Sequence, residues 1–214
     1  MKIENWGIIP FEDAWAKQRE LFNHMIKDDS IEERIILVEH KPVYTLGFHG
    51  NADNLLISRD SLLKQGINVV RIERGGDITY HGPGQLVVYP ILNLKRRKLG
   101  VKQYVHLLEN AIIKLLSVYG IKSSTDESAI GVWLDIDKPS ARKICAIGVK
   151  ISHGVTMHGL ALNVNTDLSA FDMINPCGFK DKGVTSMAKE VGFDLSLKRI
   201  KEEFAEILFD SLNK

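Results

Sequence analysis

The order of its apolar segments is the feature of this sequence that most limits its fold. Three long stretches, residues 11–27, 102–119 and 196–212, repeat apolar residues at helical spacing. Shorter apolar runs, bounded by glycine, proline or asparagine, indicate strands. We expect these strands at residues 35–38, 43–47, 69–73, 86–94, 130–134, 144–151 and 156–164, and a short helix at residues 60–64. Strands that outnumber helices without strict alternation predict an α/β (α+β) domain with a mixed sheet flanked by helices.

The run at residues 86–94 is the best candidate for a central strand. It shows no polar face before Asn93, as expected for a strand that is covered on both sides. Pro90 interrupts the pattern, because proline has no N–H to donate to a neighbouring strand. We therefore expect a bulge or the end of the strand near Pro90.

Length and composition fit one globular domain spanning residues 1–214. Hydrophobic residues make up 44% and charged residues 26% of the chain, which is ordinary globular usage. The formal net charge of +1 gives no basic excess that would indicate nucleic acid. The sequence shows no signal-peptide pattern and no apolar run near the roughly 20 residues that a membrane helix needs. We therefore expect a cytoplasmic protein.

The two cysteines, Cys145 and Cys177, are too few for a disulfide framework, and neither belongs to a CxxC pair that would indicate zinc. Cys145 lies in the apolar run 144–149, which is typical of a cysteine in a core or a pocket wall. Cys177 lies in Asn-Pro-Cys-Gly, a turn-forming context. Most free cysteines behave as small hydrophobic residues, but a thiol in such a turn is also a candidate nucleophile.

Residues 74–85 contain four glycines in twelve positions, so the backbone there must turn tightly or approach a ligand closely. The segment has neither GxxxxGK(S/T) nor GxGxxG spacing, which argues against a phosphate or dinucleotide site. From composition, a structural turn between strands and one wall of a binding pocket are equally open. Arg74, Thr79, His81 and Gln85 favour the pocket, because such side chains supply oriented hydrogen-bonding groups.

Arg-Gly-Gly at residues 74–76 and Thr-Tyr-His-Gly-Pro-Gly-Gln at residues 79–85 resemble the signature of the lipoyl(octanoyl) transferase family. Further blocks match this family in the same order along the chain, and an ordered set of blocks is far more specific than any one of them. These blocks are residues 42–47, 131–133, 143–149, 158–163 and 176–178. The resemblance covers nearly the whole chain. Cys145 is a departure from it, because members of the family usually carry alanine there.

The resemblance implies the biotin/lipoate protein ligase-like fold and a Cys–Lys dyad, in which Cys177 is the nucleophile and Lys143 its partner. Lys143 would stabilise the thiolate and then relay protons as general acid and base. By itself Lys143 would be a surface lysine, a role that Arg142 fits better. The resemblance also implies that three segments line the substrate pocket. Their residues are Arg74, Gly75, Gly76, Asp77, Ile78, Thr79, Tyr80, His81, Ala146, Ile147, Gly148, Gly159, Leu160 and Ala161.

By resemblance, the chain would transfer an octanoyl (or lipoyl) group from acyl carrier protein to a lysine of lipoyl domains, in lipoate biosynthesis. The acceptors would be lipoyl domains of 2-oxoacid dehydrogenase subunits and the glycine cleavage H protein. No nucleotide or metal cofactor is expected, because the donor arrives as a thioester on its own phosphopantetheine arm and amide formation from a thioester is downhill. We expect a monomer with no nucleic-acid or membrane partner.

Two other functions remain open. An ATP-dependent lipoate–protein ligase would share the fold and the acceptors, but such ligases need a nucleotide site and lack the cysteine block at residues 176–178. A catalytically silent acyl- or biotinyl-binding protein would keep the pocket and lose one member of the dyad, whereas Lys143 and Cys177 are both present. Turnover of a thioester donor separates the three functions.

His81 and His158 are further pocket candidates, and each precedes a glycine. They lack carboxylate or cysteine companions at suitable spacing, which argues against a metal site. Hydrogen bonding to loop backbone is an equally open role for them. Enlarging a small pocket residue, Gly159 or Ala161, is expected to weaken octanoyl transfer.

Residues 95–98, Lys-Arg-Arg-Lys, form the only dense basic run in the sequence. Such a run is usually a solvated turn. It could instead steer an acidic acyl carrier protein toward the enzyme by opposite charge.

Overall fold

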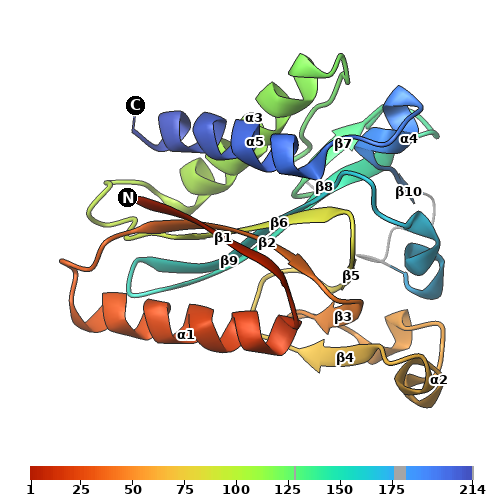
Figure 1. Ribbon diagram of the computed structural model, residues 1–214, viewed down its shortest axis with the longest axis horizontal. Coiled ribbons are helices and arrows are strands. Elements are labelled where there is room, and N and C mark those ends of the chain that lie inside the picture. The colour runs from red at the N-terminus through yellow and green to blue at the C-terminus, as the bar shows by residue number, and fades with distance from the viewer. Residues whose placement is uncertain (128, 176–181, 214) are drawn as a thin grey trace.

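The computed structural model describes residues 1–127, 129–175 and 182–213, so Cys177 lies outside the described residues. Within them, seven strands form the main sheet (Figure 1). Their order is β1 (Lys2–Ile9), β2 (Arg34–His40), β6 (Gln85–Ile91), β9 (Val155–Asn163), β8 (Arg142–Ser152) and β10 (Gly183–Val184), while β7 (Val132–Leu134) also pairs with β8. The pairs β1–β2 and β8–β10 are parallel and the others are antiparallel. The predicted mixed sheet is confirmed.

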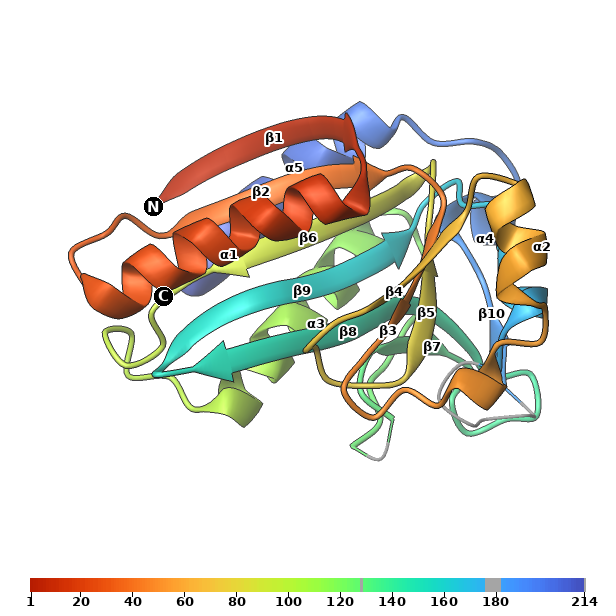
Figure 2. The same cartoon turned by 90° about the horizontal axis from the view of Figure 1, so that it is seen from below.

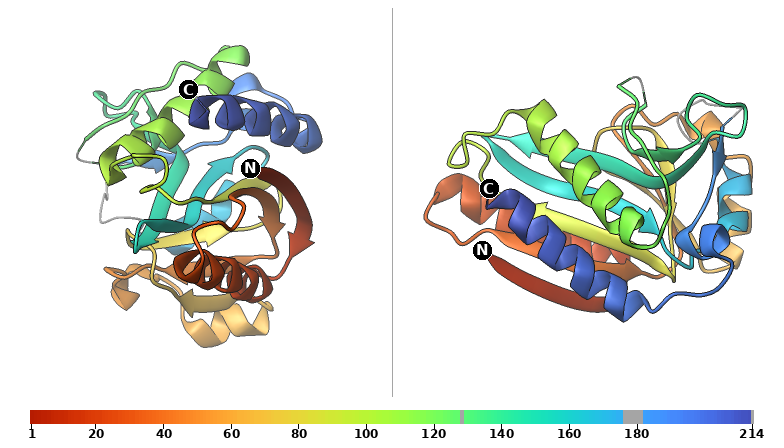
Figure 3. Two further views of the ribbon diagram at one scale, coloured as in Figure 1. Left: turned by 90° about the vertical axis from the view of Figure 1, so that its left-hand side faces the viewer. Right: turned by 90° about the horizontal axis from the view of Figure 1, so that it is seen from above.

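Helices cover both faces of the main sheet (Figures 1 and 3). One face carries α1, and the other carries α3 and α5. These helices span Phe11–Lys27, Val101–Val118 and Leu197–Leu212. Alternate residues of β2 therefore enter different cores: Ile35 and Leu37 pack with α3 and α5, whereas Ile36 packs with α1. In the described part of the chain, every helix is too short or too polar to span a bilayer.

A three-stranded sheet lies on the α1 side, beside the start of that helix (Figures 1 and 2). Its central strand β3 is parallel to β4 and antiparallel to β5. The strands span Asn68–Arg71 (β4), Val43–Leu46 (β3) and Ile78–His81 (β5). Phe11, the first residue of α1, packs with Val43 and Ile72, which joins the two sheets. The remaining short helices are η1 (Ala52–Asn54), α2 (Arg59–Lys64), η2 (Leu168–Met173) and α4 (Met187–Val191).

Three strands, β1, β5 and the two-residue β10, were not expected from the sequence. β1 is an edge strand with many exposed or half-buried residues, so it has no continuous apolar run. β5 lies inside the glycine-rich segment, which was expected to be irregular. It is a strand because all four of its residues pair with β3. Pairing with a distant segment, rather than local propensity, creates all three strands, since β10 likewise forms by pairing with β8.

Pro90 agrees with the expected end of the central strand. It is the last residue but one of β6, beyond the final β6–β9 pair, Val88 with Leu160. The Pro90 carbonyl still accepts a hydrogen bond, from the Thr156 hydroxyl at 2.6 Å. Regular β6–β9 pairing therefore ends before Pro90, which has no N–H to donate to β9.

Two arginines of the basic run 95–98 make ion pairs and a hydrogen bond within the fold. Arg96 and Arg97 contact the buried carboxylate of Glu33, at 3.2 and 2.5 Å. Burial opposes the charge of Glu33, but hydrogen bonds from Arg97 and the Asn93 N–H, together with the arginine charges, hold the pKa of Glu33 below its usual value. Arg97 also donates to the Leu212 carbonyl at the end of α5. These two charges serve the structure, which weakens the case for steering.

Candidate functional site

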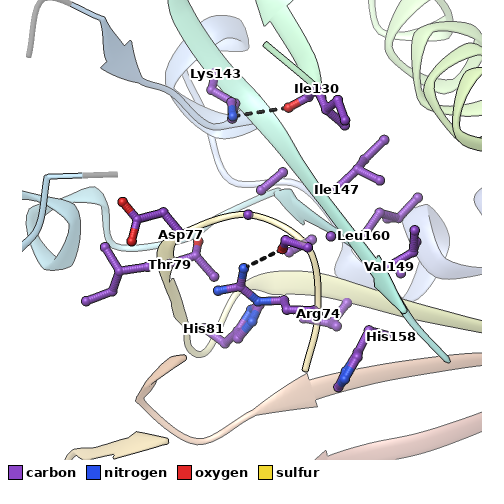
Figure 4. Close-up of a pocket in the computed structure, with 18 of the residues that line it drawn as sticks. Arg74, Asp77, Thr79, His81, Ile130, Lys143, Ile147, Val149, His158 and Leu160 are labelled. Carbon is purple, nitrogen blue, oxygen red and sulfur yellow. Dashed lines mark hydrogen bonds between the residues drawn. The ribbon is translucent and has the colours of Figure 1, made fainter. Parts of the chain in front are cut away.

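A cavity of about 440 Å³ lies between the main sheet and the glycine-rich segment (Figure 4). One wall is formed by β8 and β9 and the other by residues 74–81, and residues around β7 and β10 form one end. Every predicted substrate-binding residue lines this cavity except Tyr80, and Lys143 lines it as well. Three segments that are far apart in the sequence thus meet around one space.

The glycine-rich segment lies directly against β8. The Gly75 N–H donates to the Val149 carbonyl at 3.0 Å. A Cβ atom on Gly148 would lie 2.8 Å from the Gly75 carbonyl oxygen, and one on Gly47 would lie 2.2 Å from the Gly76 carbonyl oxygen. Close backbone approach therefore requires these glycines. The segment is both a tight structural turn and a wall of the cavity.

Arg74 anchors this wall to the smaller sheet. Its side chain is 8% exposed, and Nη2 donates to the carbonyl and hydroxyl oxygens of Thr45 at 2.7 and 2.9 Å. Nη1 donates to the Gly75 carbonyl at 2.9 Å. The guanidinium thus bridges β3 and the turn that covers the cavity.

The side chains of Asp77 and Tyr80 make contacts beside the smaller sheet. The Asp77 carboxylate accepts hydrogen bonds from the Asn51 N–H, at 3.0 Å, and from the Asn54 amide. The Tyr80 ring packs against Tyr44 and Phe171, with ring centroids 5.3 and 5.8 Å away. Tyr80 does not line the cavity, because its ring packs in the apolar core of the smaller sheet instead.

One end of the cavity, here called the mouth, is formed by Ile130, Trp133, Lys143 and Lys182. The Lys143 ammonium donates to the Ile130 carbonyl at 3.2 Å and lies 4.5 Å from the centroid of the Trp133 ring (Figure 4). The Lys182 ammonium lies 5.0 Å from the same centroid. The Trp133 Nε1–H donates to the Ala129 carbonyl at 2.7 Å, which holds the indole in place.

Helix α3 supports the mouth from behind. The buried carboxylate of Glu109 accepts a hydrogen bond from the Gly131 N–H at 3.1 Å, and its other oxygen contacts Nδ1 of His106 at 3.0 Å. Gly131 has a φ of 127°, a conformation that favours glycine. The preceding carbonyl, that of Ile130, is therefore held where it meets Lys143.

Cys145 lies in the core that α3 covers and is fully buried. Burial raises the pKa of its thiol, and a protonated thiol is a poor nucleophile. The interpretation of Cys145 as a core cysteine is thus confirmed. Cys177 lies outside the described residues, so its pairing with Lys143 stays a prediction.

The other end of the cavity, here called the inner end, is formed by His81, Tyr89 and His158. The His81 Nδ1–H donates to Gln85 Oε1 at 2.8 Å, and Gln85 Nε2 donates to Asn163 Oδ1 at 2.9 Å. This direction leaves Nε2 of His81 as an acceptor. Burial lowers the pKa of His81 to about 3, and electrostatic interactions with His40, Arg74 and His158 add to this effect. His81 is therefore neutral at ordinary pH.

His158 is held by α1. It adopts a left-handed conformation with φ of 62°, and its N–H donates to Gln18 Oε1 at 3.0 Å. Burial, followed by the charges of Arg74 and Lys150, lowers the pKa of His158 to about 3. Its Nε2 has no hydrogen-bond partner among the described residues. Of the two roles left open for His81 and His158, the pocket is favoured, because both line the cavity.

His40 and Tyr89 were not singled out in the sequence. His40 Nε2 accepts a hydrogen bond from the Tyr89 hydroxyl at 2.6 Å, and its Nδ1–H donates to the Ile9 carbonyl at 3.2 Å. Burial lowers the pKa of His40 to about 4. The two residues lie in neighbouring strands, β2 and β6, and their pairing has no signal in the local sequence.

Trp133 and Lys182 at the mouth were also missed as site residues. Trp133 belongs to the matched block 131–133, so the resemblance gave a signal for it. Lys182 belongs to no block. It reaches the mouth because β10, the strand that follows it, pairs with the start of β8.

Known proteins of one family match this chain along most of its length. Residues 10–209 match the lipoyl protein ligase A/B catalytic domain. An octanoyltransferase of Bacteroides fragilis is 51% identical over 212 residues, covering 97% of this chain and 96% of that protein. An octanoyltransferase of Bacteroides thetaiotaomicron is 52% identical over 204 residues, covering 94% and 90%.

The fold also has solved relatives. An archaeal lipoylation system, a bi-partite lipoate protein ligase and its E2 lipoyl domain from Thermoplasma acidophilum, contains a chain with a TM-score of 0.72. The match covers 99% of this chain and 83% of that chain at 15% identity, so it bears on the fold alone. It confirms the predicted ligase-like fold. The chain therefore belongs to the lipoyl protein ligase A/B catalytic domain family, among its octanoyltransferases.

Proposed function

We propose that this protein transfers an octanoyl (or lipoyl) group from acyl carrier protein to a lysine of lipoyl domains, through a thioester on Cys177. The observation that carries this proposal is the position of Lys143. In a chain that belongs with the octanoyltransferases, its ammonium lies at the mouth of a cavity large enough for an acyl chain.

The wall formed by β8 and β9 suits an acyl chain. Ala146, Gly148 and Ala161 keep it low, while Ile147 and Leu160 make it apolar (Figure 4). Each methylene group of the chain that leaves water contributes about 0.8 kcal/mol to binding. An apolar chain of several carbons can therefore be held without a charged contact.

In the loading step, the thiol proton of Cys177 passes to the neutral amine of Lys143. The thiolate attacks the carbonyl carbon of the donor thioester, so that a new C–S bond forms and the bond to the pantetheine sulfur breaks. The Lys143 ammonium returns its proton to the leaving thiolate. One thioester is exchanged for another, and Lys143 acts as base and then as acid.

In the second step, the amine of the acceptor lysine attacks the thioester carbonyl. A C–N bond forms, the C–S bond to Cys177 breaks, and Lys143 carries the released proton to the thiolate. The acceptor gains an amide and the enzyme regains its thiol. Because the donor is already activated as a thioester, this scheme uses neither a nucleotide nor a metal. The proposed acceptors are lipoyl domains of 2-oxoacid dehydrogenase subunits and the glycine cleavage H protein.

The test is intact-protein mass spectrometry after mixing the enzyme with octanoyl–acyl carrier protein. Cys145→Ala is the matched control for Cys177→Ala, since both remove one thiol. The wild type and Cys145→Ala are expected to gain one octanoyl adduct, which a lipoyl domain then removes. Cys177→Ala is expected to gain none.

An adduct that persists in Cys177→Ala would contradict the assignment of the nucleophile. A wild type without an adduct would contradict the donor. If that wild type modified a lipoyl domain with octanoate and ATP instead, the ligase function would replace the transferase function.

A further inference from the structure

The indole of Trp133 contacts two ammonium groups. Nζ of Lys143 and Nζ of Lys182 lie 4.5 and 5.0 Å from its ring centroid, within the range in which an aromatic ring attracts a cation. All three side chains line the cavity. Two groups so close to one centroid lie within a Debye length of each other, about 10 Å at 0.1 M salt, so salt screens their repulsion only partly.

The backbone brings the two lysines together. In the pairing of β8 with β10, Val184 lies opposite Lys143, and the Gly183 N–H donates to the Ala141 carbonyl at 2.9 Å. Lys182 precedes this short strand directly. The indole is 2% exposed and comes from β7, on which β8 also pairs. Three segments therefore converge on this arrangement.

We propose that Lys182 is a further positioning residue of this site, which keeps a positive charge beside Lys143 on the shared platform of Trp133. The inference rests on the proposed function. Lys143 must be neutral to take the thiol proton, whereas a nearby positive charge favours loss of that proton, and a neutral Lys143 cannot supply it. With Lys182 present, the mouth stays positive while Lys143 is neutral.

The neighbouring charge assists both stages of the proton relay. Repulsion between like charges favours the neutral form of Lys143, which is the form that accepts a proton. Once the thiolate of Cys177 has formed, the positive charge of Lys182 remains to stabilise it and the oxyanion that follows. Protons and charges balance as in the loading step, because Lys182 neither gains nor loses a proton.

The test compares Lys182→Gln with Lys182→Arg in the full-length enzyme. Single-turnover loading from octanoyl-pantetheine, followed by intact mass, avoids any contribution from docking of a carrier protein. We expect the loading rate of Lys182→Gln to fall by a factor of about ten or more. Removing one preorganised group of an oxyanion site lowers the rate about 10²- to 10³-fold, and Lys182 acts less directly than such a group. Lys182→Arg keeps the charge and can stack on the indole, so it is expected to restore most of the rate.

Alkylation gives a second readout that is independent of acyl transfer. In a Cys145→Ala background, the rate of Cys177 modification by anionic iodoacetate relative to neutral iodoacetamide is expected to fall in Lys182→Gln and to recover in Lys182→Arg. The matched control is Lys198→Gln, which removes an exposed lysine of α5. Lys182→Met serves in place of Lys182→Gln if that variant does not fold.

Equal loading by the wild type and Lys182→Gln would overturn the inference, and so would an Lys182→Arg enzyme as slow as Lys182→Gln. A wild type that takes no octanoyl group would instead overturn the proposed function. The alkylation ratio would then still decide whether Lys182 places a charge near Cys177.

Discussion

The two ends of the cavity are built from different kinds of side chain. The mouth contains the ammonium groups of Lys143 and Lys182, and Ile130 there is 53% exposed. The inner end contains His81 and His158, which are 7% and 2% exposed and neutral because burial lowers their pKa values to about 3. The two lysines thus lie at the more exposed end, whereas both histidines at the inner end are neutral.

This difference separates chemistry from recognition. Lys143 and Val149, which pairs with His158, lie six positions apart on β8, roughly 20 Å at the rise of a strand. An extended eight-carbon chain is shorter than this. A thioester carbonyl at the mouth would therefore leave its acyl tail along the wall formed by β8 and β9, short of the histidines, while proton transfer takes place at the mouth.

The largest effect is expected from removing the amine of Lys143 at the mouth. Lys143→Gln removes the proposed acid and base, and such groups contribute about 10²- to 10⁴-fold to rate. The single-turnover loading rate from octanoyl–acyl carrier protein should fall by that factor, with an unchanged circular dichroism spectrum. Lys198→Gln should load normally. A loading rate of Lys143→Gln within about threefold of the wild type would contradict the role of Lys143, because a general acid or base contributes far more than that. The two ends would then not differ in chemistry.

The next largest effect is expected between the two ends, at Gly159. A Cβ there would lie 2.1 Å from the Val88 carbonyl oxygen and 2.8 Å from Pro90 Cδ, so it meets β6. Gly159→Ala should therefore destabilise the fold, by about 3 kcal/mol, as severe overpacking does. Gly75→Ala is the control, because the nearest atom to its Cβ is 3.6 Å away. Urea unfolding measures both, and equal midpoints would contradict the clash.

This contact changes what a substitution at Gly159 can test. The sequence suggested that a larger residue there would crowd the acyl chain. In the structure, such a residue disturbs the pairing of β6 with β9 first. Ala146 is the better position for crowding the cavity, because it lines the wall and is only half-buried.

A smaller effect is expected from narrowing the cavity at Ala146. Ala146→Leu should slow loading from an octanoyl donor about tenfold, since misfitting of a few methylene groups is worth about 1–3 kcal/mol. Loading from an acetyl donor should change little, because a two-carbon chain stays at the mouth. Single-turnover rates with the two donors measure this. Equal slowing of both would mean that the chain does not pass Ala146.

The last effect, on stability and about one bound proton in size, is expected from the charge state of His158 at the inner end. The pKa of His158 is about 3 in the folded protein and about 6.5 in a solvated chain. Between about pH 6.5 and pH 3, the His158 imidazole is protonated in the unfolded chain but neutral in the folded protein. This contribution to stability is therefore complete above pH 6.5 and is lost as pH falls, at about 1.4 kcal/mol per pH unit.

Urea unfolding between pH 7 and pH 5 checks this prediction. His158→Gln should flatten the decline of stability by about one proton. Lys198→Gln is the control and should keep the slope of the wild type, because it leaves every histidine in place. An unchanged slope in His158→Gln would contradict the lowered pKa of His158, and with it the difference in charge between the two ends of the cavity.

Much of the fold was accessible from local pattern. The helix at residues 11–27 was predicted with its observed bounds, and the helix at residues 102–119 with a shift of one residue. Both carry an apolar stripe, and such periodicity records which face is buried. β5 was missed because four residues in a glycine-rich segment carry no period, and they form a strand through β3.

The candidate site divides in a similar way. The motif blocks by themselves identified the segments at residues 74–81, 146–148 and 159–161 that line the cavity, together with Lys143. The blocks indicated these residues through the family resemblance, and close backbone approach explains why glycines recur in them. They also included Tyr80, since a contiguous motif does not reveal which side chains of a strand face inward.

The sequence by itself determined the family, the proposed dyad and the apolar periodicity of the main elements. Only the tertiary structure decided that Lys182 shares the Trp133 indole with Lys143, and that His40 supports Tyr89 at the inner end. The physical reason is the range of the interactions. Helix stripes and glycine turns arise between near neighbours in the chain, whereas cation–π contacts and buried hydrogen bonds depend on which distant strands pair.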